Sequence, residues 1–235
     1  MTILFDSFIK NQEMCFSANA SFTAGTVLTV IGAISVRKVK APSQIFFASI
    51  PVLFAIQQFS EGFLWLSLTK PAFADLRTSM TFIFLFFAQV VWPFWVPFAV
   101  LKLKPKNERS VIGKLFLIAG SSVSLYLGYC LLNYPVNARI DEMHIAYDQL
   151  YPQSIAFICG IFYVLATVFP PFLAGIKRMW MLGLSILISY VITTIFYNDY
   201  LVSVWCFFAS VISIAVYSVV HEFVIVEKKA VSQIV

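Results

Sequence analysis

Residues 79–101 read SMTFIFLFFAQVVWPFWVPFAVL, a run of twenty-three residues that contains no charged side chain. A helix of about 20 apolar residues spans the hydrocarbon core of a bilayer, which is about 30 Å thick. The run therefore predicts a membrane-spanning helix. Pro93 and Pro97 fall inside it, and because each proline removes a backbone donor, a kink is expected there.

Six more windows of this kind follow from the same criterion, and Glu61 is the one charged residue inside them: residues 16–36, 43–68, 115–132, 151–175, 180–197 and 201–220. The runs are continuous, without the short alternation of a transmembrane barrel. Apolar residues make up 60% of the chain and charged residues 11%, against about 25% charged in soluble domains. The sequence predicts an all-α integral membrane protein with seven transmembrane helices.

The basic residues predict the orientation of these helices. Twelve of the sixteen lie in the links after odd-numbered windows or near the C-terminus: Arg37, Lys38, Lys40, Lys102, Lys104, Lys106, Arg109, Lys114, Lys177, Arg178, Lys228 and Lys229. Cytoplasmic loops are enriched in Lys and Arg. We therefore expect a multi-pass protein of the inner (plasma) membrane with its N-terminus outside and its C-terminus inside. The net charge of +5 is read as a topology signal, and no nucleic-acid partner is expected.

Residues 14–235 are expected to form a single membrane domain, preceded at 1–13 by an extension or a short interfacial segment. Met14 is an alternative start. The longest link, 133–150, is either a solvated connector or a functional loop. Two rows of small residues predict close helix packing. They are Ser17, Ser21, Gly25 and Gly32 in the first window, and Gly120, Ser124 and Gly128 in the fourth.

Polar residues in the second and third windows predict a ligand-binding site. Glu61, Gln57, Gln58 and Trp65 form a stripe along one side of the second predicted helix. Ionisable groups are costly in hydrocarbon and usually face the interior of a bundle. The third window adds Gln89 and Trp92, and we predict that these six residues surround an outward-facing pocket. Glu61 is alternatively a buried carboxylic acid that only joins neighbouring helices.

The four cysteines all fall in the outer half of the predicted bundle. Cys15, Cys206 and His144 of the outer loop are candidate metal ligands, and with Glu61 they offer a mixed set of soft and hard ligands. No paired spacing of Cys or His supports a metal site, so a Cys15–Cys206 disulfide and simple apolar packing stay open. The last window contains no Lys for a retinal Schiff base, and two histidines are too few for a seven-helix zinc hydrolase.

The stretch MCFSA at 14–18 resembles the opening of an uncharacterised family of bacterial multi-span membrane proteins, a domain of unknown function. The similarity extends to QQxxEGxxW at 57–65, WP at 92–93 with Pro97, HIxY at 144–147 and SxWC at 203–206. The resemblance implies a fold and a family membership, and it favours Met14 as the family-type start. It implies no activity.

Three functions remain open at the level of sequence. The first is a protein that binds a small molecule or ion, with sensing or transport as the outcome. The second is a membrane-embedded enzyme or metal protein that uses Cys15 or Cys206, Glu61 and His144. The third is a structural or assembly partner. The lipid bilayer is a partner in all three, while the sequence predicts neither a particular cofactor nor an oligomeric state.

Overall fold

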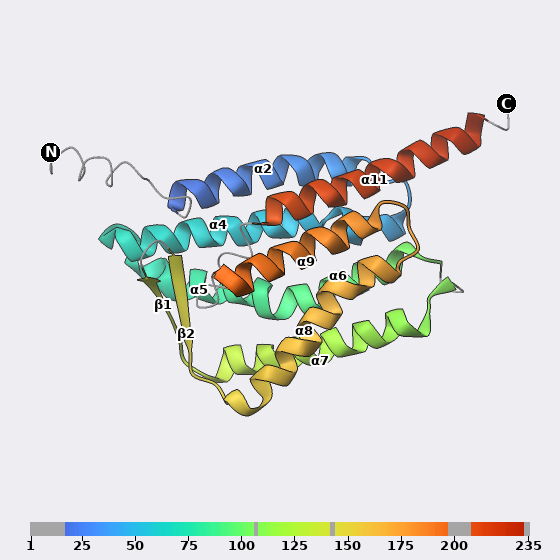
Figure 1. Ribbon diagram of the computed structural model, residues 1–235. Helices are drawn as coiled ribbons and strands as arrows, with labels where there is room; N and C mark the ends of the chain where they lie inside the picture. Colours follow the sequence, from blue (N-terminus) through green and yellow to red (C-terminus); the bar gives the residue numbers. More distant parts are fainter. Residues whose placement is uncertain (1–16, 106–107, 142–143, 197–207, 233–235) are drawn as a thin grey trace, which may run out of the picture.

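The computed structural model describes residues 17–105, 108–141, 144–196 and 208–232. Successive long helices lie side by side and alternate in direction, and a two-stranded hairpin packs at one end of the bundle (Figure 1). The elements in chain order are α2 (Ala18–Arg37), η1 (Pro42–Gln44), α3 (Ile45–Ala48), α4 (Ile50–Thr69), η2 (Pro71–Leu76), α5 (Arg77–Leu85), η3 (Phe86–Val91), α6 (Trp92–Leu103), α7 (Val111–Asn133), β1 (Val136–Asp141), β2 (His144–Gln149), α8 (Gln153–Leu173), α9 (Met179–Phe196) and α11 (Ala209–Ser232).

The described helices have the lengths and compositions of membrane spans. Five helical stretches are long and apolar enough to cross a bilayer: Ala18–Arg37, Pro42–Thr69, Pro71–Leu103, Val111–Asn133 and Ile155–Leu173. Two shorter apolar helices follow, at Met179–Ile195 and Ala209–Ile225. Each of the seven predicted windows overlaps one of these stretches. The expectation of a mainly helical protein of membrane type is confirmed.

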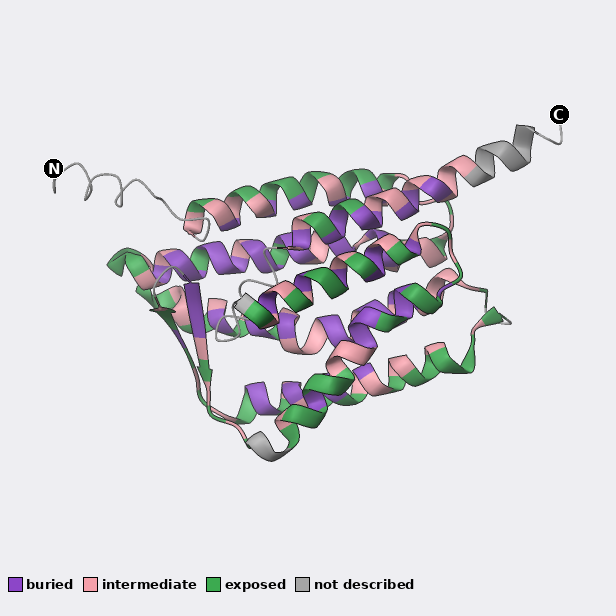
Figure 2. Ribbon diagram, in the orientation of Figure 1, coloured by how far each residue is buried: buried purple, intermediate pink, exposed green. Residues whose placement is uncertain are grey.

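The outer surface of the bundle is apolar over much of its length. Exposed residues alternate with buried ones around α7, α8 and α9, so one side of each helix faces outward (Figure 2). The outward side chains are large hydrophobic residues, and Leu125 and Phe157 are 76% and 78% exposed. Soluble monomers rarely expose so much contiguous apolar surface, and lipid is the solvent that matches it.

Small residues bring α2 and α4 into close contact, as the first predicted row of small residues requires. Gly25 lies against the ring of Phe59, and Gly32 lies against Val52. Ser21, Gly25 and Gly32 are all buried. Because lipid tails are as apolar as helix side chains, close backbone approach of this kind is a main source of helix association in membranes.

The helical stretch from α5 to α6 is continuous but contains a π-helical segment, η3, just before Pro93. A π-turn joins residue i to residue i−5, so the donor for the Ala88 carbonyl would be the backbone N–H of residue 93. Proline has none. The hydroxyl of Tyr163 on α8 donates to this carbonyl instead, at 2.7 Å. The predicted kink is therefore present as a π-segment, and a neighbouring helix supplies the missing donor.

Pro97 has a similar effect one turn later, because it has no N–H to donate to the carbonyl of Pro93 four residues earlier. That carbonyl oxygen lies against Gly120 of α7, so closely that a methyl group on Gly120 would overlap it. Ser124, one turn further along α7, donates to the carbonyl of Val90 at 2.8 Å. The second predicted row of small residues thus packs against a main chain that proline has opened.

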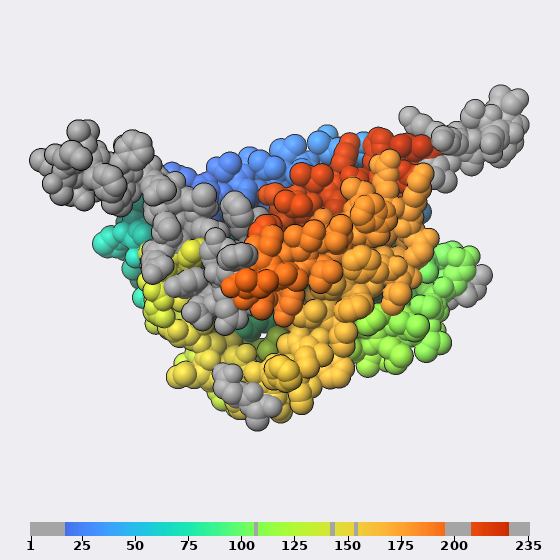
Figure 3. Space-filling model, in the orientation of Figure 1, coloured from blue at the N-terminus to red at the C-terminus, as the bar shows by residue number. Residues whose placement is uncertain are grey.

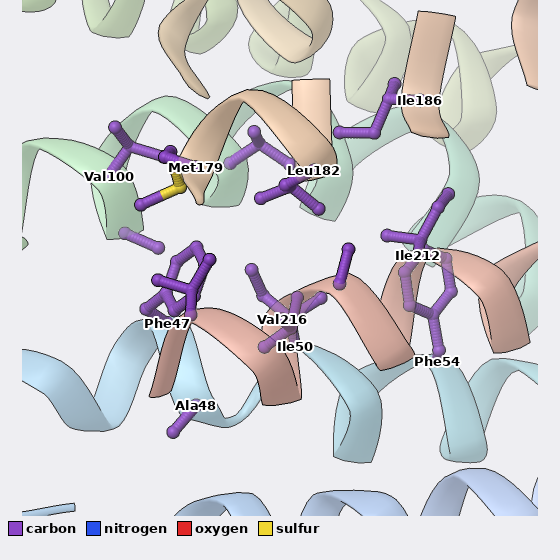
Figure 4. Packing of buried hydrophobic residues seen from close by; sticks show 14 of the residues in the cluster. Phe47, Ala48, Ile50, Phe54, Val100, Met179, Leu182, Ile186, Ile212 and Val216 are labelled. Atoms are coloured by element: carbon purple, nitrogen blue, oxygen red, sulfur yellow. The ribbon is translucent and has the colours of Figure 1, made fainter. Parts of the chain in front are cut away.

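The core of the bundle lies between α3, α4, α6, α9 and α11. Figure 4 shows Phe47 and Ile50 facing Leu182 of α9 and Val216 of α11, with Val100 of α6 beside them. These five side chains are at most 5% exposed. Burying a large aliphatic or aromatic side chain stabilises a fold by about 1.5–3 kcal/mol relative to exposure to water. Inside a bilayer, where the alternative environment is lipid and not water, van der Waals packing between helices takes the place of this stabilisation.

The link at 133–150 contains a β-hairpin, so the chain is mainly helical and not all-α as expected. β1 pairs antiparallel with β2, and Ile145 of β2 packs with Leu64 and Trp65 of α4. Tyr147 stacks on Phe84 of α5 with ring centroids 5.1 Å apart. The hairpin packs on the bundle through Ile145 and Tyr147, two residues apart on β2 and therefore on the same side of the strand, which cover apolar surface at the end of the bundle.

The two ends of the bundle differ in charge. The links at α2–α3, α6–α7 and α8–α9 meet at the end opposite the hairpin, which we name the basic end (Figure 1). Glu222 of α11 is 6% exposed there and pairs with Lys177 and Arg178, each at 3.1 Å. Glu222 is a buried carboxylate in addition to Glu61. It lies two residues after the last predicted window, 201–220, so the criterion of a charged residue inside a window does not identify it.

We predict that Gly120→Ala destabilises the protein by about 1–3 kcal/mol, because the new methyl group must displace the Pro93 carbonyl. The measurement is thermal unfolding of the purified protein in detergent. Gly160→Ala is the matched control: an added methyl group there has no neighbour within 4 Å. Equal unfolding temperatures for the two variants would contradict the close approach of α6 and α7.

Candidate functional site

A cavity of about 270 Å³ lies among α4, η3, α6, α7, α8, α9 and α11. One side of α8 lines it, with Ala156, Gly160, Tyr163 and Thr167 at helical spacing. From α9 it takes Leu182, Ile186 and Tyr190, which recur every four residues. In the space-filling view a hollow is visible between the first part of α8 and the last part of α9 (Figure 3).

The deep part of the cavity has apolar walls, and its polar atoms are already bonded within the protein. Tyr163 donates to the Ala88 carbonyl, as described above, and Thr167 Oγ1 donates to the Tyr163 carbonyl at 2.9 Å. The remaining wall there is aliphatic or aromatic, with Ile50, Val96 and Leu182 among its residues. No charged side chain occurs among the described residues that line this cavity.

Trp92 forms one wall, and two residues of α4 hold it in place. Its indole Nε1 donates to Gln57 Oε1 at 2.7 Å, and Gln57 is fully buried. Its ring stacks on Phe54 with centroids 3.9 Å apart and an interplanar angle of 27°. Gln57 therefore fixes the position of the indole and contacts the cavity through it. Phe54 and Trp92 themselves line the cavity.

Gln89 of the π-segment lies where the cavity approaches the hairpin. Its Nε2 donates to Gln149 Oε1 of β2 at 2.7 Å, which joins the hairpin to the bundle. Within the described part of the chain, Gln89 Oε1 and Gln149 Nε2 are buried and have no hydrogen-bond partner. Exchanging O and N in both amides would reverse the bond between them and still leave one buried acceptor and one buried donor.

The predicted stripe on α4 is buried, but only part of it adjoins the cavity. Gln58 Nε2 donates to Glu61 Oε2 at 3.2 Å, and both side chains are at most 4% exposed. Trp65 packs against the hairpin with Ile145. Glu61, Gln58 and Trp65 are not among the described residues that line the cavity. The structure thus places Gln89 and Trp92 at the cavity with Gln57 behind Trp92, and it leaves the other three in the packing around α4.

The predicted metal ligands are not brought together by the described structure. His144 is buried at the start of β2, while Cys15 and Cys206 lie outside the described residues. Among the residues that the structure describes, no group of three or more His, Cys, Asp or Glu side chains could hold a metal ion. Cys159, by contrast, lines the cavity as a buried free thiol. The metal hypothesis for Cys15, Cys206 and His144 stays a prediction.

Sequence reasoning missed the contribution of α8 and α9 to this site. The six residues predicted to surround the pocket all come from the second and third windows. The described lining residues instead come from every long helix except α2. A signal was present: Tyr163 and Tyr190 place phenols in the middle of otherwise apolar windows, and Gly160 leaves open space on α8.

Fold and cavity together define a class: a helical protein of membrane type with an internal, mainly apolar pocket. The chain belongs to a family whose model, described as a family of unknown function (DUF6629), matches residues 14–230. The matched region begins at Met14 of the MCFSA stretch, and the suspected membership of an uncharacterised family is confirmed. No curated protein and no solved structure matches the chain.

We predict that Gln57→Leu destabilises the protein by about 1–3 kcal/mol, because the buried indole N–H of Trp92 loses its acceptor. In the double variant Gln57→Leu/Trp92→Phe both partners are apolar. Its loss of unfolding free energy is therefore expected to be smaller than the sum of the losses in the two single variants, by about 0.5–3 kcal/mol. The measurement is a double-mutant cycle by thermal unfolding. Strict additivity would show that this hydrogen bond does not hold the cavity wall.

Proposed function

We propose that this protein spans the inner membrane seven times and binds a small, mainly apolar ligand in the cavity between α4, α6, α8 and α9. Sensing or transport of that ligand is the function that such a site serves. Gln89 and Trp92 contact the ligand, and Gln57 positions Trp92. The observation that carries the proposal is a cavity of about 270 Å³ with apolar walls in the middle of an apolar bundle.

The seven-span topology is supported by the alternating direction of the five long and two shorter apolar stretches in the described part of the chain (Figure 1) and by the charge of their links. Arg37 ends α2, Lys104 follows α6 and Lys177 lies in the link between α8 and α9, so all three belong to the basic end, as the positive-inside rule requires of a cytoplasmic side. The hairpin end then faces outward. The segment that begins with α2 starts outside, and α11 ends in the cytoplasm.

The chemistry of the cavity favours a ligand over a bound ion. An ion buried without charged partners or dedicated ligands is strongly disfavoured, and the described lining holds no charged group. Pockets that bury drug-sized ligands measure about 300–1,000 Å³, so this cavity suits a molecule at or below the small end of that class. Apolar cavities of about 150 Å³ already bind benzene or xenon.

Reporter fusions after Lys106 and after Glu142 are expected to lie on opposite sides of the membrane, cytoplasmic for the first and external for the second. α7 is the only helix of membrane-spanning length in the described residues between the two positions, so a single crossing decides the outcome. A paired set of alkaline phosphatase and fluorescent-protein fusions measures it. The same side for both fusions would contradict the proposed topology.

Benzene at saturation is expected to raise the unfolding temperature of the purified protein, because a ligand that binds only the folded state stabilises it by about 2.7 kcal/mol at one hundred times its Kd. In Gly160→Phe the added ring has open space toward the cavity, so the variant is expected to fold and to lose the benzene effect. Thermal scans with and without benzene measure both changes.

Ile158→Phe provides the matched control, since this residue lies on the same helix, is 51% exposed and does not line the cavity. It adds the same aromatic ring to the outward side of α8. Its response to benzene is expected to equal that of the unmodified protein. An equal response in Gly160→Phe as well would place the benzene effect outside the cavity and overturn the proposed function.

A further inference from the structure

We infer that the cavity opens sideways onto the hydrocarbon of the bilayer, between the first part of α8 and the last part of α9, and admits a hydrocarbon chain of a membrane lipid there. This inference rests on the proposed function and names the class and the source of its ligand. Three observations carry it: the divergence of α8 and α9, the position of the opening within the apolar surface and the lack of charge in the described lining.

α8 and α9 pack directly on each other near the link that joins them and diverge toward the hairpin end (Figure 1). Close to the link, Gly183 of α9 lies so near the ring of Phe172 that an added methyl group would overlap it. Nearer the hairpin end of α8, nothing lies within 4 Å of the position that a side chain of Gly160 would occupy. The two helices therefore leave space between them only where they have separated.

The cavity is not enclosed, and it opens where these two helices diverge. Figure 3 shows the hollow from the side of the bundle, in a view across the helices. Gly160 is exposed, Ala156 and Tyr190 are half-buried, and all three line the cavity. We name these three residues the side opening. A ligand that enters there passes neither the hairpin nor the basic end.

The side opening lies within the apolar surface of the bundle. Gly160 follows Gln153, the first residue of α8, by seven positions, which is about 10 Å at 1.5 Å per residue. Phe157 lies nearer the hairpin end than Gly160 and is 78% exposed. On α9, Ile195 lies beyond Tyr190 in the same direction and is 68% exposed. Because exposed hydrophobic side chains continue past the opening toward the outer side, the opening faces lipid in the proposed topology.

The lining matches a hydrocarbon chain and not a head group. The described lining holds no charged side chain, and an uncompensated charge is strongly disfavoured there. A cavity of about 270 Å³ lies below the range of about 300–1,000 Å³ that accommodates drug-sized molecules, and a phospholipid is larger than these. The head group therefore stays at the membrane surface while one chain enters. Hydrocarbon chains are the solvent at the side opening, so this occupant is always in contact with it.

The test uses the full chain in phosphatidylcholine nanodiscs that contain a small share of the same lipid with a diazirine at the end of one chain. After illumination, peptide mass spectrometry is expected to find label on Phe54 or Trp92, which line the cavity from α4 and α6 and are at most 8% exposed. Label on Leu125 and Phe157 is expected as well, because both side chains face outward. Outward label without label on Phe54 or Trp92 would overturn the inference.

Gly160→Phe is expected to lower the label on Phe54 and Trp92 about tenfold relative to the label on Leu125, because the added ring occupies the side opening. Ile158→Phe adds the same ring to the outward side of α8 and is expected to leave this ratio unchanged. An unchanged ratio in Gly160→Phe would mean that the chain reaches Trp92 by another route, which overturns the side opening. The label on Phe54 and Trp92 in the unmodified protein does not depend on the folding of either variant.

A second lipid, with the diazirine next to its head group, separates entry of one chain from entry of the whole molecule. Its label is expected on outward residues and not on Phe54 or Trp92. Equal label on these two residues from both lipids would mean that the head group also enters, and it would overturn the inference. If Gly160→Phe abolishes the benzene effect while neither lipid labels Phe54 or Trp92, the proposed function stands and the lipid chain is excluded as its ligand.

Discussion

The constraint on which the rest of the structure depends is that a backbone carbonyl inside an apolar bundle must find a donor within the protein, since lipid supplies none. Pro93 and Pro97 remove two such donors from the stretch between α5 and α6. The π-segment and the Tyr163 hydroxyl on Ala88 are the responses, and Gly120 allows α7 to approach the carbonyl of Pro93 closely. Two prolines in one helix thereby fix the positions of α7 and α8.

The cavity is a further product of the same arrangement. Tyr163 joins α8 to the middle of the α5–α6 stretch, and α8 crosses α7 obliquely rather than lying parallel to it (Figure 1). Helices that diverge leave space unless large side chains fill it. Residue 160 of α8 is glycine, and nothing lies within 4 Å of the position its side chain would occupy. The π-segment meanwhile brings Gln89 and Trp92 to the opposite wall.

Much of the helical architecture could be predicted because it rests on local composition. Windows without charge mark the helices, and rows of small residues such as Gly25 and Gly32 mark their close contacts, since both signals are visible along one chain. The hairpin was missed because each strand is only six residues long and its turn has no Asn-Gly or Asp-Gly signal. Part of the site could be predicted because the depth of a residue along a helix follows from its position in the sequence. The tilt of each helix, which decides which residues of neighbouring helices meet, does not follow from the sequence in this way. Trp92 bonds to Gln57 and lines the cavity together with Gln89, while Glu61, which we expected in the same pocket, is not in the described lining.

The hydrogen bonds from Tyr163 and Ser124 end on the main chain, at the carbonyls of Ala88 and Val90. Every amino acid carries that carbonyl, so mutations at 88 and 90 can accumulate during evolution without removing the acceptor. Selection falls on the hydroxyl-bearing partners instead. Tyr163 and Ala88, and likewise Ser124 and Val90, will therefore vary independently of each other in related sequences, and covariation between these positions will under-report how tightly α7 and α8 are joined to the α5–α6 stretch.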